Sequence, residues 1–225
     1  MCHTMQSSIE SAQLSIIQSL NTLEEKDFMM DRWERPGGGG GLTAIIEKGS
    51  VFDKGGVNTS AVHGKITKKE RPMFQQLLSH QGLEMPSISE PSFFATGVSL
   101  VLHPKNPFAP TVHANYRYFE LETGKEPIWW FGGGTDLTPY YLFEEDAEHF
   151  HKILKTCCDA FDPSYYPKFK ARCDEYFYLP HRCETRGIGG IFYDYLNDNP
   201  QERLLEFSRA CADSFIPAYL PILEK

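Results

Sequence analysis

The chain opens with apolar residues that recur every three or four positions. This spacing predicts an amphipathic α-helix whose buried face carries Ile9, Ala12, Ile16, Leu20 and Leu23. Further helices are predicted over residues 67–81, 143–161 and 167–178. The last predicted helix begins at Pro200, with Asn199 as its N-cap and Glu202 completing a capping arrangement.

Between these helices the pattern changes to short segments typical of β-strands. Strands are predicted over residues 42–52, 55–64, 92–103, 111–121, 127–131 and 189–196. The connections between the three central strands have hairpin length, which favours antiparallel pairing. We therefore predict one α+β domain, in which helices cover a mainly antiparallel sheet.

Polar side chains gather on one face of two of these strands. Alternation places His113, Asn115 and Arg117 on one face, and Ser99 and His103 on one face of the preceding strand. If His103 pairs with His113, Ser99 lies opposite Arg117. Such a cluster is costly on a covered face unless it binds something or is fully hydrogen-bonded, which points to a site. The alternative is the solvent-facing side of a half-exposed sheet.

Two glycine runs interrupt the pattern. The run 132–134 suits close approach of the backbone to a ligand. Asp136 follows it, and is either a site residue or a residue of the Thr138-Pro139 turn. The run 37–41 lacks the P-loop pattern and is interpreted as a flap beside a site or as a plain linker.

Four histidines form a candidate metal site. Imidazole groups of His103, His113, His151 and His181 suit zinc, iron or manganese. No short ligand spacing such as H-E-x-x-H supports this reading. The six cysteines include no C-x-x-C pair and are interpreted as free thiols.

Charge and composition narrow the class of protein. With 22 Lys and Arg against 30 Asp and Glu, the net charge of −8 argues against nucleic-acid and anionic-membrane partners. No apolar run reaches the ~18 residues of a membrane span. The N-terminal segment lacks the features of a signal or transit peptide, so we expect a cytoplasmic protein. Aromatic residues make up 13% of the chain, which suits a core and also a pocket for a flat ligand.

Five segments, in order along the chain, carry a family resemblance. They are DRWERPGGGG, GGVNTSAVHG, FFATGVSLVLHPKNPFAPTVHANYRYFE, WWFGGGTDLTPYY and HRCETRGIGGIFYDYL. Together they closely resemble the signature blocks of oxygen-dependent coproporphyrinogen III oxidases. The resemblance implies a large, flat antiparallel sheet sandwiched between helices, in a homodimer. It also implies oxidative decarboxylation of two propionates of coproporphyrinogen III to vinyl groups, giving protoporphyrinogen IX in haem biosynthesis.

The resemblance also assigns roles to residues. It implies that Ser99, Asn115 and Arg117 bind substrate, that His113 donates a proton, and that Asp136 lies among the pyrrole NH groups. No organic cofactor is implied, and molecular oxygen is the electron acceptor. In bacterial relatives the histidines matching His103, His113, His151 and His181 are assigned to a divalent metal, which we do not expect to be required.

The family pattern continues beyond the last segment of this sequence. We therefore expect a chain that lacks the family's C-terminal segment, whose activity and dimerisation would be weakened. Two alternatives remain open. One is a metal-dependent enzyme that uses the four histidines, and the other is a non-catalytic tetrapyrrole-binding module.

Overall fold

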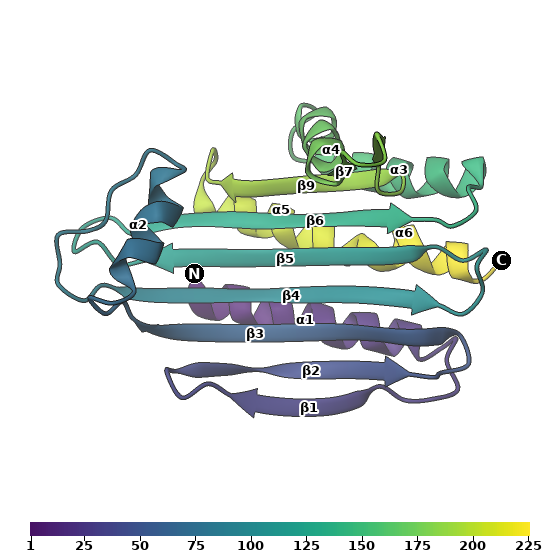
Figure 1. Cartoon of the computed structure of the whole chain (residues 1–225), viewed down its shortest axis with the longest axis horizontal. Helices are drawn as coiled ribbons and strands as arrows, with labels where there is room; N and C mark the ends of the chain where they lie inside the picture. Colours follow the sequence, from purple (N-terminus) through teal and green to yellow (C-terminus); the bar gives the residue numbers. More distant parts are fainter.

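A seven-stranded antiparallel sheet forms the centre of the computed structural model, which describes residues 1–225. Its strand order is β1-β2-β3-β4-β5-β6-β9, so almost every strand lies beside its neighbour in sequence (Figure 1). The strands of the sheet are β1 Met29–Glu34, β2 Gly39–Glu47, β3 Phe52–Lys65, β4 Ser92–Pro104, β5 Thr111–Leu121, β6 Ile128–Thr138 and β9 Gly189–Leu196. A separate two-stranded ribbon pairs β7 Tyr178–Leu179 with β8 Glu184–Thr185.

Six helices accompany the sheet, and they divide unequally between its two faces. They are α1 Cys2–Leu20, α2 Arg71–Ser79, α3 Glu144–Asp159, α4 Tyr165–Tyr176, α5 Gln201–Asp213 and α6 Phe215–Leu223. Figure 1 shows α1, α5 and α6 behind the sheet, whereas α2 lies on the opposite face at one end. Helix α4 contacts the edge strand β9. The predicted α+β class with an antiparallel sheet is confirmed.

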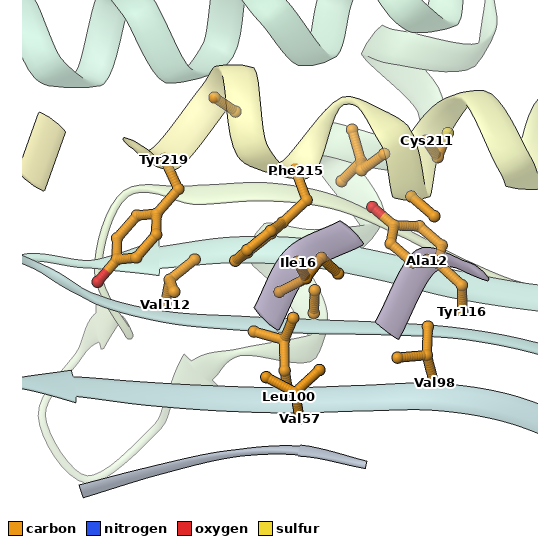
Figure 2. Close-up of a cluster of buried hydrophobic side chains, with 14 of the residues drawn as sticks. Ala12, Ile16, Val57, Val98, Leu100, Val112, Tyr116, Cys211, Phe215 and Tyr219 are labelled. Carbon is orange, nitrogen blue, oxygen red and sulfur yellow. The ribbon is translucent and has the colours of Figure 1, made fainter. Parts of the chain in front are cut away.

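The main core lies between the sheet and the helices behind it. Figure 2 shows strand side chains meeting side chains from α1, α5 and α6. Those labelled are Ala12, Ile16, Val57, Val98, Leu100, Val112, Tyr116, Cys211, Phe215 and Tyr219. They belong to one cluster of 37 buried residues. Burial of this apolar surface is the main stabilising contribution to the fold.

A smaller cluster lies on the opposite face, beneath α2. Phe74 and Leu78 of this helix pack with Ile66, Leu121 and Trp130. This cluster closes only one end of the face. The rest of the face is available for the polar side chains of the central strands, so one sheet serves as a core on one side and as a site on the other.

The first predicted helix is confirmed as α1, whose buried residues include Ile9, Ala12 and Ile16. It ends at Leu20, so Leu23 lies in the following turn rather than on the helix. None of the six helices combines the length and apolar character that a membrane crossing requires. The six cysteines are free, as predicted.

The predicted end of a strand at residue 131 is wrong, because β6 continues through the glycines to Thr138. A Cβ on Gly132 would lie 2.7 Å from Arg117 Nε, and one on Gly133 would lie 2.6 Å from Tyr193 Oη. Side chains from the neighbouring strands therefore occupy the space above these residues. Glycine is needed here for close packing, although it normally weakens a strand.

The glycine run 37–41 is neither a flap nor a linker. Residues 39–41 belong to β2, which pairs with β1, a strand that the sequence pattern did not predict. Gly39 has a φ of +88°, and a Cβ there would lie 2.1 Å from the carbonyl oxygen of Ala61. The run therefore allows a tight turn and close strand pairing.

The capping prediction for the penultimate helix is also wrong. Helix α5 begins at Gln201, its N-cap position is Pro200, and no side chain caps it. The Asn199 amide instead donates to the Tyr165 hydroxyl at 2.9 Å. A tertiary contact has replaced the local one that the sequence pattern suggested.

Candidate active site

The polar side chains of β4 and β5 share the open face of the sheet, as predicted. Ser99, His113, Asn115 and Arg117 all line one pocket. The predicted register is wrong, because Ser99 pairs with Asn115, and Gly97 pairs with Arg117. The difference amounts to two residues along the strand. Since side chains alternate with a period of two, such a shift leaves each one on its predicted face.

The pocket has a volume of about 330 Å³ and is open to solvent on the uncovered side of the sheet. Strands β3 to β6 and β9 form its floor, and residues from α4 and from the segment after β8 form one side. Its polar lining comprises Asn58, Ser99, His113, Asn115, Arg117, Asp136 and Arg186. Its aromatic lining comprises Tyr176, Phe177 and Phe192.

Asp136 is the most deeply placed charged group of the pocket, with only 3% of its surface exposed. It lies within β6, directly opposite His113, so the interpretation as a turn residue is wrong. Arg186 Nη2 donates to Asp136 Oδ2 at 2.8 Å. The His113 ring approaches the same oxygen, with Nδ1 at 3.4 Å. The carboxylate therefore has an arginine as its hydrogen-bonded partner and a histidine ring nearby.

Arg186 is a pocket residue that sequence reasoning did not assign to the site. Its guanidinium carbon lies 4.0 Å from the centre of the Phe177 ring, in a cation–π contact. Its Nε is buried and has no hydrogen-bond partner. Fifty residues separate Arg186 from Asp136 along the chain. The only sequence signal was a basic pair with Arg182 after His181.

Arg117 is held in place by two neighbours. Its Nη1 donates to Asn115 Oδ1 at 2.8 Å, and its Nη2 lies 3.0 Å from Asp194 Oδ2. The side chain is 40% exposed. A guanidinium has five N–H donors, so this anchoring leaves donors free for an anionic ligand.

Besides Arg186 Nε, two more buried polar atoms of the pocket lack hydrogen-bond partners. They are Oδ1 of Asn58 and Nδ1 of His113. Asn58 lies on β3 as the cross-strand neighbour of Ser99, and sequence reasoning did not identify it. Because buried polar atoms are nearly always paired, these two mark positions where a ligand would supply hydrogen bonds.

Aromatic rings form one side of the pocket. The rings of Tyr176 and Phe192 stack with centroids 4.2 Å apart and planes 17° from parallel, and Phe177 lies beside them. Such surfaces pack well against flat ring systems. Other aromatic residues, such as Tyr116 and Phe131, are buried in the core. Aromatic residues therefore occur both in the core and along the pocket.

Only two of the four histidines lie near each other, because the rings of His103 and His113 meet edge to face with centroids 6.5 Å apart. His103 Nδ1 lies 3.4 Å from Thr111 Oγ1, while His181 is exposed between β7 and β8. His151 is engaged at both ring nitrogens, with the carbonyl oxygen of Ile188 at 3.1 Å and the Tyr166 hydroxyl at 3.0 Å. Burial lowers the pKa of His103 and that of His151. No three His, Cys, Asp or Glu side chains are placed to share a metal ion.

A buried carboxylate paired with arginine beneath an open, aromatic-sided pocket is typical of a site that binds a small molecule. Comparison with known proteins identifies the family of the chain. The family model for coproporphyrinogen III oxidase matches residues 4–225, and the chain belongs to that family.

Named relatives agree with this assignment. The chain is 52% identical to coproporphyrinogen-III oxidase 1, chloroplastic, of Arabidopsis thaliana, over 96% of this chain and 56% of that protein. It is 49% identical to the oxygen-dependent enzyme of Drosophila melanogaster, over 100% and 57% of the two chains. It is 46% identical to the mitochondrial oxygen-dependent enzyme of Homo sapiens, over 96% and 48%. The chain spans about half the length of these relatives.

Proposed function

We propose that this protein carries out oxygen-dependent oxidative decarboxylation of two propionates of coproporphyrinogen III, giving protoporphyrinogen IX. The observation that carries the proposal is the buried Asp136–Arg186 pair beneath a pocket that also presents Arg117. Family membership supports the same reaction. An oxidase of this kind needs groups that hold carboxylates, groups that accept hydrogen bonds from pyrrole N–H groups, and a proton donor.

Each turn of the reaction converts one propionate into a vinyl group. The bond between the carboxylate and its carbon chain breaks and releases carbon dioxide. One hydrogen leaves the neighbouring carbon, and the electron pair released reduces molecular oxygen. With one further proton, oxygen becomes hydrogen peroxide. The substrate supplies the electrons, so the protein is left with positioning and proton management.

Arg117 is proposed to hold a propionate. Its guanidinium is oriented by Asn115 and Asp194, and its free N–H groups can form two parallel charge-assisted hydrogen bonds to a carboxylate. Ser99 and Asn115 add short polar groups on the same face. Asn58 Oδ1 offers an unused acceptor for a pyrrole N–H.

Asp136 is proposed to accept hydrogen bonds from pyrrole N–H groups while the ring loses electrons. Its carboxylate stabilises the positive charge that develops on the ring, and it can accept a proton. Arg186 holds the carboxylate of Asp136 in place through the 2.8 Å contact. His113 Nδ1 lies 3.4 Å from the same oxygen, which supports the proposal that its ring donates a proton.

The direct test is incubation of the protein with coproporphyrinogen III in air, followed by mass analysis of the products. Each vinyl group formed removes the elements of formic acid from the substrate. Asp136→Asn should lower turnover by orders of magnitude. Asp31→Asn makes the same change on the exposed strand β1 and should leave turnover unchanged. If both variants kept normal turnover, the proposed role of Asp136 would be contradicted.

Neither an organic cofactor nor a metal ion is proposed for this reaction. His151 already uses both ring nitrogens for protein hydrogen bonds, which supports a structural role for it. We predict that turnover survives exhaustive chelation. Loss of turnover on chelation, with recovery on adding manganese or iron, would instead favour the histidine-bound metal.

Assembly and location are part of the same proposal. A homodimer is expected from the family resemblance, and gel filtration with intact mass measures it. The alternative of a tetrapyrrole-binding module predicts binding of the ring without peroxide release. A cytoplasmic location remains a prediction, while the names of the Arabidopsis and human relatives place those proteins in chloroplasts and mitochondria. Fractionation of the source cells would decide it.

A further inference from the structure

Helices α3 and α5 bring two cysteine side chains together at the edge of the main core. The Sγ atoms of Cys157 and Cys211 lie 3.8 Å apart, although 54 residues separate them along the chain. Cys157 is partly exposed, whereas Cys211 is fully buried. Figure 2 shows Cys211 on α5, among the core side chains near Tyr116. One thiol is therefore reachable from solvent, and its neighbour is protected.

The two thiols differ in their chemistry as well as in exposure. Hydrogen bonding with Cys211 and Ser214 lowers the pKa of Cys157 against the opposing effect of burial. Burial raises the pKa of Cys211 well above its usual range. Because the thiolate is the nucleophilic form, Cys157 is the one of the two thiols that would react first with a small oxidant.

We propose that Cys157 and Cys211 form a peroxide-oxidisable pair that closes to a disulfide between α3 and α5. In the first step the sulfur of Cys157 attacks hydrogen peroxide, the O–O bond breaks, and a sulfenic acid and one water form. In the second step the sulfur of Cys211 attacks that sulfur, the S–O bond breaks, and a second water leaves. Two thiols are oxidised and one peroxide is reduced.

The geometry allows the second step with little movement. A disulfide has an S–S length of about 2.05 Å, so the two sulfurs must approach by under ~2 Å from their separation of 3.8 Å. The link would tie α3 to α5 and restrict the unfolded chain over a long loop. The oxidant is the compound that the proposed function releases, so the site would register the enzyme's own product.

The test uses added hydrogen peroxide, so its outcome does not depend on turnover. After treatment, intact mass should show the loss of two hydrogens, and peptide mapping should join the peptides that carry Cys157 and Cys211. Reduction with dithiothreitol should reverse both changes. The oxidised protein should melt several degrees higher than the reduced one, as expected for a long closed loop.

Variants separate this pair from the other thiols. Cys211→Ser should leave a sulfenic acid on Cys157 that dimedone traps, and Cys157→Ser should abolish the disulfide. Cys183→Ser, at an exposed thiol, should change neither result. A disulfide that joins Cys157 to Cys158, or oxidation confined to Cys183, would overturn the proposal. Formation of a disulfide between Cys211 and another cysteine in Cys157→Ser, to the same extent as in wild type, would overturn it as well.

Discussion

The pairing of Asp136 with Arg186 can be tested by its effect on stability. Asp136 has 4% of its side chain exposed and Arg186 has 33%. Breaking a fully buried ion pair costs about 3–5 kcal/mol because the remaining charge loses its partner. The partial exposure of Arg186 lets water replace some of that interaction. We therefore expect Asp136→Asn to lower the free energy of unfolding by about 1–3 kcal/mol.

A double-mutant cycle isolates the pair itself. The single variants Asp136→Asn and Arg186→Gln and the double variant are compared by urea denaturation. We expect a coupling energy of about 1–2 kcal/mol, which is less than for a fully buried pair because of the exposed part of Arg186. At a chain length of 225 residues, each kcal/mol corresponds to a shift of about 2–4 °C in Tm.

The matched control is the exposed pair Arg172 and Glu175, whose side chains are 56% and 69% exposed. Exposed pairs usually contribute ~0–1 kcal/mol, so its cycle should give a coupling near the lower limit. Equal coupling energies in the two cycles would refute the reasoning. The Asp136 carboxylate would then be balanced by solvent rather than by Arg186.

Three further predictions follow from other parts of the structure. Glu24 accepts hydrogen bonds from Ser50 and from backbone N–H groups, which lower its pKa to about 2 despite the opposing effect of burial. Glu24→Gln should therefore lower the free energy of unfolding by about 2–3 kcal/mol at neutral pH. In urea titrations at a series of pH values, wild type should lose this contribution as pH falls from about 4.5 towards 2, because the pKa of Glu24 is lower in the folded state than in the unfolded state. A difference in unfolding free energy between wild type and Glu24→Gln that stays constant with pH would contradict the assignment. Gly133→Ala should destabilise the protein by about 1–3 kcal/mol in the same denaturation assay, because its Cβ would lie 2.6 Å from Tyr193 Oη. Asn58→Leu should raise the Kd for a fluorescent porphyrin in titration while leaving the melting temperature nearly unchanged, since Asn58 Oδ1 has no protein partner.

Alternation along the strands predicted which side chains share a face, but it could not predict the register. The pairing of Ser99 with Asn115 rather than Arg117 differs from the expectation by an even number of positions. Every even shift satisfies the same pattern of faces. The register depends on the hairpin between β4 and β5, whose conformation the spacing alone does not define.

Local patterns failed where a distant side chain decided the outcome. Glycines 132–134 suggested the end of a strand, but Arg117 and Tyr193 from neighbouring strands occupy the space that side chains would need. Asn199 suggested a helix cap, but it bonds Tyr165. Arg186 was missed as a partner of Asp136 because only the folded chain brings them together. The family resemblance pointed to Asp136, but it did not name Arg186 as the protein partner of that carboxylate.

The glycines of β6 have a consequence for recognition. Gly133 and Gly134 line the pocket with main-chain atoms only. Because they have no side-chain rotamers, this part of the pocket surface cannot change its shape around a ligand. Any adjustment of fit must come from the ligand. A macrocycle whose bridging carbons are tetrahedral can bend to follow such a surface, whereas a fully conjugated one is held flat. For the substrate proposed here, the rigid surface of this strand would therefore bind the reduced ring better than its oxidised, flat forms. This selection by shape would take place at binding, before any bond is broken.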